Sequence, residues 1–417
     1  MNPDLVRLQA HPSKRISELA RERRNAIDLT VGEPRFGPPQ LVVDTFIEAL
    51  RENGTQPWKY PAAVGDLSLR EAVSRYVLTV AGVEIDPINE ILITHGAAEA
   101  IWLTVFGTTA PGDEVILGDP AYVLYERIVR ALGRMPVRIP TDRHRGGELR
   151  PEDVRRALTP RTKLLIVNSP DNPTGAVYQP TTMRDLVELC ADAHVYLAHD
   201  EVFDFMVYQG RHVSALAASS SRKHAISINS FSKRFGVTGW RVGWLIAEPD
   251  CMRELAKAHT FFALTTSTPI QRALAKGLSA PNIMSLLDER AASYGQAIRL
   301  AEAAFRELGF RAFSGMPCGG FYLFLDTTDA LHRLQRSTRL REAYALGRSE
   351  RSCGERVADV LLEEYGVAVV PGNAFGTSGN DCIRLSVACD PSLVDDALFR
   401  LRSGPLLEPA HGSDASV

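Results

Sequence analysis

The segment SFSKRFGVTGWRVG, residues 230–243, carries the pattern that decides how this chain is interpreted. Lys233 stands among hydroxyl and apolar residues where a strand is predicted to end, and Arg241 follows eight residues later. Burial and nearby cations lower the pKa of a lysine and make its amine a nucleophile toward aldehydes. An arginine guanidinium suits bidentate contact with a phosphate. The segment therefore predicts a reactive amine near a phosphate-binding cation, rather than a surface lysine beside a glycine turn.

Short apolar runs that end in polar residues surround this segment from about residue 90 to residue 250. Strands are predicted within residues 90–96, 111–120, 163–170, 195–201, 225–233 and 242–249, and a helix over 97–110. This alternation favours an α/β fold whose mostly parallel sheet is covered by helices on both faces. In such sheets the functional site lies beyond the carboxyl ends of the strands, where the polar residues gather.

The sequence changes in character after about residue 285, which predicts a second, smaller α+β domain. A long helix is expected over 289–310 and strands over 319–327, 365–372 and 382–388. We therefore predict an N-terminal segment (1–48) that joins the small domain, a large domain (49–285) and a small C-terminal domain (286–403). Residues 327–356, rich in Arg, Ser and Glu, are interpreted as a solvated surface insertion, with a partly helical segment, a mobile lid and a disordered loop as alternatives. Residues 404–417 are expected to form a disordered tail.

Composition excludes several classes of protein. The 417 residues carry a formal net charge of −3, which argues against a nucleic-acid binder. No run of about 18 apolar residues predicts a membrane span, and the N-terminus lacks the apolar region of a secretory signal. The six cysteines show neither C-x-x-C nor zinc-ligand spacing, so no metal is expected. Free thiols are typical of a reducing compartment, and a cytoplasmic location is predicted.

Three further segments fit the chemistry of residues 230–243. Asp200 closes an apolar strand, and a carboxylate there can keep a pyridine nitrogen protonated, which makes the ring an electron sink. The turn NSPDNPTG (168–175) can present the Asn172 amide to a ring oxygen. Gly96, Ala97 and Ala98 open a helix directly after a strand, and the free N–H groups there can cradle a phosphate.

Together these segments resemble the class I/II pyridoxal-phosphate-dependent aminotransferases, the aspartate-aminotransferase-like enzymes of fold type I. The likeness runs in collinear order from Asp28 to Leu401. It includes LTVGEPRFGPP (29–39), NSPDNPTGAVY (168–178), HDEVFDF (199–205), SFSKRFGVTGWRVGW (230–244), GGFYLFLD (319–326) and IRLSVA (383–388). The resemblance implies a seven-stranded sheet in the large domain, pyridoxal 5′-phosphate as cofactor, and an amino acid and a keto acid as substrates. It also implies a homodimer whose two subunits share their active sites.

The resemblance assigns a role to each matching residue. Lys233 would hold the cofactor as a Schiff base and move the proton between the substrate Cα and the cofactor. Asp200 would pair with the pyridine nitrogen, Asn172 with the ring oxygen, and Tyr122 would stack on the ring. The phosphate would be held by Ala97, Ala98, Ser230, Ser232 and Arg241, with Tyr60 reaching it from the partner subunit. Arg384, helped by Gly32 and Asn172, would bind the α-carboxylate of the substrate.

The chain departs from the family pattern at several positions. Phe203 stands where relatives carry a tyrosine, and Ala98 replaces a polar residue that contacts the cofactor phosphate. The Gly-Glu-Pro segment continues with Arg35, where Asp is common in relatives. Arg35, His95, Glu99 and residues 265–268 are candidates for the wall that contacts the substrate side chain. A lyase, synthase or oxidase on the same scaffold remains an alternative to an aminotransferase. A non-catalytic regulator is disfavoured, because it would need an added DNA-binding domain. A dinucleotide-binding dehydrogenase is disfavoured, because no G-x-G-x-x-G follows any predicted strand.

Overall fold

A seven-stranded sheet forms the centre of the larger part of the molecule in the computed structural model, which describes residues 12–23, 25–51, 59–219, 222–336, 351–403 and 406. The strand order is β2-β8-β7-β6-β5-β3-β4. These strands are β2 (Ile91–Thr94), β3 (Glu114–Asp119), β4 (Met135–Pro140), β5 (Thr162–Asn168), β6 (Tyr196–Asp200), β7 (Ala225–Ser230) and β8 (Gly243–Ile246). Strand β8 runs in the direction opposite to the other six strands. The prediction of a mostly parallel α/β sheet is confirmed.

The edge strand β4 is the one strand of this sheet that the apolar runs did not predict. Its sequence, MPVRIP, is interrupted by an arginine and bounded by two prolines, and only Ile139 in it is buried. Proline is tolerated on an edge strand because one side of the strand needs no ladder hydrogen bonds. A sequence with this composition lacks the continuous apolar run of an inner strand.

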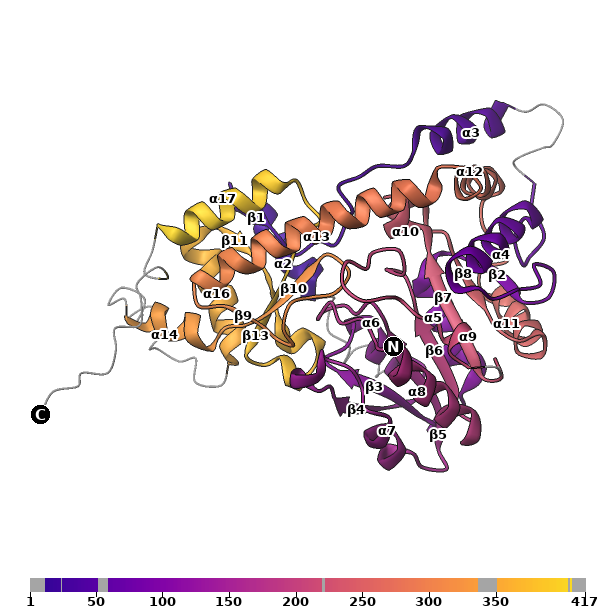
Figure 1. Cartoon of the computed structure of the whole chain (residues 1–417), viewed down its shortest axis with the longest axis horizontal. Helices are drawn as coiled ribbons and strands as arrows, with labels where there is room; N and C mark the ends of the chain where they lie inside the picture. Colours follow the sequence, from indigo (N-terminus) through magenta and orange to yellow (C-terminus); the bar gives the residue numbers. More distant parts are fainter. Residues whose placement is uncertain are drawn as a thin grey trace, which may run out of the picture.

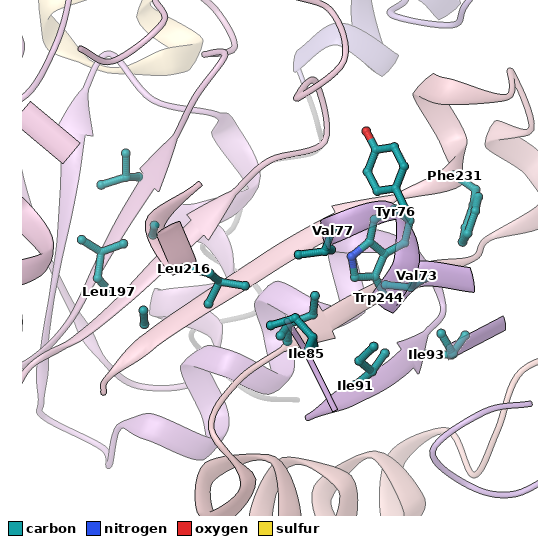
Figure 2. Close-up of a cluster of buried hydrophobic side chains, with 14 of the residues drawn as sticks. Val73, Tyr76, Val77, Ile85, Ile91, Ile93, Leu197, Leu216, Phe231 and Trp244 are labelled. Atoms are coloured by element: carbon teal, nitrogen blue, oxygen red, sulfur yellow. The ribbon is translucent and has the colours of Figure 1, made fainter. Parts of the chain in front are cut away.

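Helices cover both faces of the sheet (Figure 1). One face packs against α4 (Leu67–Ala81), α8 (Pro180–Asp192), α9 (Ala215–Ala218) and α12 (Thr268–Leu278). The other face packs against α5 (Gly96–Thr108), α6 (Val123–Ala131) and α11 (Pro249–Phe262). Ile91 and Ile93 face the first layer while Leu92 faces the second, as the period of two in a strand requires. Figure 2 shows the first core, where Ile91 and Ile93 lie near Trp244 and Val73.

A smaller α+β part is built around the sheet β12-β13-β10-β9. Its strands are β9 (Arg311–Ala312), β10 (Tyr322–Asp326), β12 (Val370–Pro371) and β13 (Cys382–Ser386), and α16 (Cys353–Tyr365) and α17 (Pro391–Arg402) pack against it. The predicted strand over 365–372 divides, because β11 (Val367–Ala368) pairs elsewhere. The long helix α13 (Ile283–Glu307) connects the two parts (Figure 1). Its first residues are buried in the large core and its later residues in the small core.

The N-terminal segment divides between the two parts rather than joining the small domain throughout. Strand β1 (Ile27–Asp28) pairs with β11, and α2 (Pro12–Glu22) lies beside that pair. In contrast, α3 (Gln40–Arg51) packs along α12, and its Val42 is buried in the core of the large part. Apolar residues at helical spacing, LVVDTFIEAL, give α3 a face to bury there.

The interpretation of residues 327–356 as a solvated surface segment is wrong at both ends, where the chain is helical; residues 353–356 open α16, and Gly354 there is buried. Residues Thr328–Arg336 form α14, in which Ala330, Leu331 and Leu334 are buried against the small core. Of the predicted tail, Leu406 is buried in the same core. Residues 337–350, 404–405 and 407–417 lie outside the described part of the chain. Within the described part, no helix is long and apolar enough to cross a bilayer.

Candidate active site

A cavity of about 650 Å³ opens at the carboxyl ends of the parallel strands, where the large and small parts meet. Strands β5, β6 and β7 end at Asn168, Asp200 and Ser230, which all line this cavity. Its wall also includes the other residues predicted to bind the cofactor or the α-carboxylate, except Tyr60: Gly32, Ala97, Ala98, Tyr122, Asn172, Ser232, Lys233, Arg241 and Arg384. A cavity of this size suits a small organic ligand.

Lys233 lies on the short turn of helix that follows β7, α10 (Phe231–Arg234). Its Nζ donates a 2.6 Å hydrogen bond to the backbone carbonyl of Gly32. Burial lowers the pKa of this amine to about 8, with the positive charges of Arg241 and Arg384 adding to the effect and Glu33 opposing it. A substantial share of the amine is therefore neutral near pH 8, which a nucleophile requires.

A buried ion pair holds the turn that carries Lys233. Arg234 is fully buried and its Nη2 lies 2.8 Å from Asp204 Oδ1, while its guanidinium packs 4.2 Å from the ring centroid of Tyr76. Asp204 also accepts hydrogen bonds from the Tyr76 hydroxyl at 3.0 Å and from Asn229 Nδ2 at 3.0 Å. A buried charge needs such partners. The network ties the lysine turn to the loop that follows β6.

Asp200 accepts a hydrogen bond from a residue that the sequence reasoning missed. The Tyr125 hydroxyl donates to Asp200 Oδ2 at 2.7 Å, and both side chains are buried. Burial raises the pKa of Asp200 to about 6, although the Tyr125 hydrogen bond and the charge of Lys233 oppose the rise. Tyr125 is three residues after Tyr122, so the two tyrosines of AYVLY share a helix face. This spacing is the feature of the sequence from which Tyr125 could have been predicted as a site residue.

The residues beside Asp200 point to the opposite face of the sheet. Glu201 accepts hydrogen bonds from the Ser214 hydroxyl at 2.9 Å and contacts His212 Nε2 at 2.7 Å. His199, also on this face, accepts a hydrogen bond from the Ala215 backbone at Nδ1, at 3.1 Å. The two histidines outweigh the effect of burial and lower the pKa of Glu201 to about 2. These contacts hold the carboxyl end of β6 in place on the face of the sheet opposite to Asp200.

One corner of the cavity is formed by the closely packed backbone at the start of α5 and at Gly243, together with the side chain of Arg241. Helix α5 begins at Gly96, which has a φ of +75°, and the guanidinium Nη2 of Arg241 lies 2.6 Å from the position of a Cβ at that residue. A Cβ at Gly243 would lie 2.9 Å from the Ala97 backbone nitrogen. Arg241 itself has a φ of +52°, which is unusual for a non-glycine residue and is common at ligand sites. The corner offers a helix N-terminus and a cation to an anion.

Two serines complete this corner. The Ser230 hydroxyl donates to the Ser232 hydroxyl at 2.9 Å, and both side chains line the cavity. With Arg241 and the first N–H groups of α5, they make a donor set suited to a phosphate. A ring attached to that phosphate would extend toward Lys233 and Asp200, which line the same cavity. The residues present therefore fit pyridoxal 5′-phosphate.

Arg384 lies across the cavity from this corner, on strand β13. Its Nη1 donates to Asn172 Oδ1 at 3.1 Å and its Nη2 to the Thr30 carbonyl at 2.6 Å. The guanidinium carbon lies 4.2 Å from the ring centroid of Tyr322, a cavity residue that the sequence reasoning missed. The arginine is buried and held in a fixed orientation, as recognition of a carboxylate requires.

Several expectations about the cavity wall are wrong. Arg35 turns away and donates to the Ser293 hydroxyl at 2.6 Å and to the Val387 carbonyl at 3.2 Å, because its guanidinium stacks on Tyr294. Glu99 does not line the cavity. It accepts a hydrogen bond from the His95 backbone and contacts His259 Nδ1 at 2.9 Å. The residues at 265–268 are not part of the wall either.

Tyr60, predicted to contact the cofactor phosphate, also lies outside the cavity. Its side chain is 81% exposed, and it lies on the surface of the large part. A contact between Tyr60 and a ligand in this subunit's own cavity is therefore not formed.

The fold and the cavity together define a pyridoxal-phosphate-dependent enzyme of fold type I. Comparison with known proteins gives the family, since the family described as "Aminotransferase class I and II" matches residues 24–401. The chain belongs to this family and is a pyridoxal-phosphate-dependent aminotransferase.

Similar proteins cover nearly the whole chain. A probable aspartate/prephenate aminotransferase of Aquifex aeolicus is 31% identical over 95% of this chain and 96% of its own. An aspartate/prephenate aminotransferase of Thermus thermophilus is 32% identical over 92% of each chain. Among solved structures, an aspartate aminotransferase from Thermus thermophilus with maleate aligns with a TM-score of 0.85. It is 29% identical and covers 97% of this chain and 99% of its own.

Proposed function

We propose that this cavity transfers the amino group of an α-amino acid to a 2-keto acid, with Lys233 as the group that binds the cofactor and moves the proton. The observation that carries this proposal is the convergence of Lys233, Asp200 and Arg384 on one cavity from three distant parts of the chain. When bound, pyridoxal phosphate supplies an electron sink conjugated to the substrate Cα. The protein must then hold the cofactor, orient the amino acid and move one proton.

The donors at the α5 corner are suited to hold the cofactor phosphate. Ala97 and Ala98 offer backbone N–H groups, Ser230 and Ser232 offer hydroxyls, and Arg241 offers a guanidinium. Ala98 lacks the side-chain donor that the family usually has at this position of the phosphate-binding corner. The backbone N–H remains, because it belongs to the helix N-terminus and not to the side chain.

Asp200 is suited to keep a proton on the pyridine nitrogen. Its Oδ2 accepts the Tyr125 hydroxyl and its Oδ1 accepts the Val202 backbone N–H at 3.3 Å, so both oxygens are held in a fixed orientation at the cavity wall. Tyr122 lines the same cavity, and in this proposal its ring stacks on the pyridine. Asn172, already hydrogen-bonded to Arg384, can reach the ring oxygen and the substrate together.

Arg384 is suited to bind the α-carboxylate of the substrate. A bidentate guanidinium–carboxylate pair in a buried site fixes both the position and the orientation of the amino acid. Gly32 lies beside it and accepts the Lys233 hydrogen bond through its carbonyl. Because Arg384 and Lys233 line the same cavity, a carboxylate held by Arg384 would bring the substrate Cα toward Lys233 Nζ, which would then remove and return the Cα proton.

We also propose that the enzyme is a homodimer whose interface includes an exposed aromatic patch near Tyr60. The patch contains Trp102, Phe106, Phe261 and Phe262, and Phe261 is 89% exposed. Trp102 stacks on Phe106 at 4.9 Å and on Phe262 at 4.3 Å between ring centroids. The segment that follows Phe262 lies beside the Tyr60 segment, since Thr265 donates to the Ala62 carbonyl at 3.2 Å and Thr268 to the Lys59 carbonyl at 3.3 Å. Exposed apolar patches of this kind mark interfaces, and Tyr60 would cross into the partner's cavity.

The dimer is tested by sedimentation of the holoenzyme and by two variants. Phe261→Glu should convert the dimer to monomer and reduce activity, because a charge would be buried in the interface. Tyr60→Phe should leave the dimer intact but weaken cofactor binding. A fully active monomer would refute the proposal.

A cytoplasmic location is proposed on the six cysteines, which are all unpaired in the structure. Fractionation of the source cells tests it.

The reaction is tested by a single turnover of the holoenzyme with acidic, aromatic and basic amino acids in turn. The relatives carry names for aspartate, aromatic and diaminopimelate substrates, so the panel spans these classes. We expect the right donor to leave one equivalent of keto acid and one of aminated cofactor. Repeated consumption of the donor without a keto acid acceptor, with the cofactor back in its aldehyde form, would instead support elimination, replacement or oxidation.

A further inference from the structure

Tyr322 presents a hydroxyl group to the cavity without a partner. The residue lies on β10, is 4% exposed and lines the cavity wall. Among the described residues, no group forms a hydrogen bond with this hydroxyl. The hydroxyl oxygen is not among the fully enclosed unpartnered atoms of the described residues, so it is accessible from the cavity. A donor that lines a ligand cavity and has no partner in the protein points to a contact with the ligand.

The hydroxyl lies against the segment that contacts Lys233. A Cβ built on Gly32 would lie 1.8 Å from the Tyr322 oxygen, so only glycine allows the hydroxyl this position. The carbonyl of the same glycine accepts the hydrogen bond from Lys233 Nζ at 2.6 Å. The tyrosine oxygen is therefore close to the reactive amine, on the side of the cavity formed by residues 30–32.

The ring of Tyr322 lies beside Arg384. In the antiparallel pair of β10 and β13, Tyr322 is opposite Ser386 and Phe324 is opposite Arg384. Tyr322 and Arg384 are thus diagonal neighbours on one face, within reach of an aromatic and a long side chain. The Arg384 guanidinium carbon lies 4.2 Å from the ring centroid, and its Nη2 donates to the Thr30 carbonyl at 2.6 Å. A carboxylate bound by Arg384 would have residues 30–32 and the Tyr322 hydroxyl as its next neighbours.

Phe203 fixes the position of this ring. Its own ring meets that of Tyr322 edge-on, with centroids 6.1 Å apart and an interplanar angle of 86°. It meets Phe321 in the same way at 5.1 Å. Phe203 has no hydroxyl, so of these two packed rings it is Tyr322 that offers a phenol oxygen to the cavity.

We propose that the Tyr322 hydroxyl donates a hydrogen bond to the α-carboxylate of the bound amino acid, beside Arg384 and Asn172. The proposal rests on the carboxylate-binding role of Arg384 given above. In it, the ring of Tyr322 orients the guanidinium and the hydroxyl binds the same carboxylate, so that one residue serves two parts of substrate recognition.

The test compares a ligand that has the carboxylate with one that lacks it. The holoenzyme is titrated, by cofactor absorbance, with the α-methyl derivative of its best amino donor and with the corresponding decarboxylated amine. The α-methyl derivative binds but has no Cα proton to lose. A hydrogen bond to a charged group should make Tyr322→Phe bind the α-methyl amino acid about 10- to 100-fold more weakly. Binding of the amine should be unchanged.

Two further variants separate the hydroxyl from the ring. Tyr322→Leu should weaken the amino acid more than Tyr322→Phe does, because Arg384 loses its aromatic neighbour as well. Tyr178→Phe is the matched control, since Tyr178 is also buried but its oxygen accepts from the Leu149 backbone at 3.0 Å, away from the cavity. It should leave both affinities unchanged.

The inference is overturned if Tyr322→Phe weakens the amino acid and the amine equally. It is also overturned if the variant changes cofactor affinity or the spectrum of the unliganded enzyme, because the hydroxyl would then contact the cofactor. Failure of the proposed function appears differently. If Arg384→Ala keeps the preference for the amino acid over the amine, Arg384 does not bind the carboxylate. If Arg384→Ala removes that preference and Tyr322→Phe does not reduce it, only the role of Tyr322 falls.

Discussion

Replacement of Asp200 by asparagine should stabilise the cofactor-free protein while it weakens cofactor binding. Asp200 is 3% exposed, and burial raises its pKa from 3.8 to about 6. An acid whose pKa is raised on folding holds its proton more tightly in the folded state. Its ionisation therefore costs no stability below pH 4, costs more as the pH rises toward 6, and costs a constant amount above that. A shift of about 2 units corresponds to about 3 kcal/mol.

The assay is urea unfolding of the cofactor-free wild type and of Asp200→Asn at pH values from 4 to 8. The free energy of unfolding should be equal near pH 4, and that of the variant should exceed the wild type by about 3 kcal/mol above pH 6. The difference between the proteins removes the contribution of other titrating groups. Cofactor affinity should fall about 10- to 100-fold, because a charge-assisted hydrogen bond is lost.

Glu201→Gln is the matched control on the neighbouring residue. Burial alone would raise the pKa of Glu201, but His199 and His212 lower it to about 2. Its charge therefore stabilises the folded state above the unfolded pKa, and that stability is lost as the pH falls toward 2. The control should be less stable than the wild type at pH 7, the opposite of Asp200→Asn. The reasoning is refuted if Asp200→Asn has the wild-type stability at every pH, or if it binds the cofactor with wild-type affinity.

Three more substitutions test the site. Lys233→Ala should abolish turnover and the visible absorbance of the lysine-bound cofactor, and a borohydride-reducible cofactor in this variant would show that another lysine binds it. In the wild type, the rate of cofactor uptake should rise with pH around 8, because the lowered pKa of Lys233 leaves a growing share of the amine neutral there. Arg384→Ala should raise KM by about 10- to 100-fold, since a buried charged hydrogen bond contributes about 1.5–3 kcal/mol, and unchanged steady-state kinetics would contradict its role. Phe203→Tyr adds a donor on the cavity wall, so the visible band should titrate at a lower pH than in the wild type, and a spectrophotometric midpoint that stays or rises would count against a contact with the cofactor.

The sequence by itself determined the class of fold and the position of Lys233 at the end of a strand. Apolar runs that end in polar residues define β5, β6 and β7, because a strand buried on both faces must be apolar until it leaves the sheet. The polar ends then mark the edge where Asp200 and Lys233 lie. The N-terminal start of α5 was equally readable, since a glycine followed a strand and opened a helix.

The same local reasoning fails where the pattern is weak or where a partner is distant. Strand β4 is an edge strand with little apolar surface, so it lacks the run that marks an inner strand. Arg35 and Glu99 carry charges that suit a substrate pocket. Their direction is set by Ser293 and Tyr294 for the first and by His259 for the second.

Only the tertiary structure decided which residues complete the site. Arg384 meets Asn172 across 212 residues of sequence, and Tyr125 meets Asp200 across 75. Tyr322 reaches the cavity because β10 pairs with β13 in one register and because Gly32 leaves room for its hydroxyl. Spacing along a strand or helix is a local property, so it shows which face a side chain occupies. Which faces meet depends on how the two parts of the molecule pack, and that packing places the tyrosines beside Asp200 and Arg384.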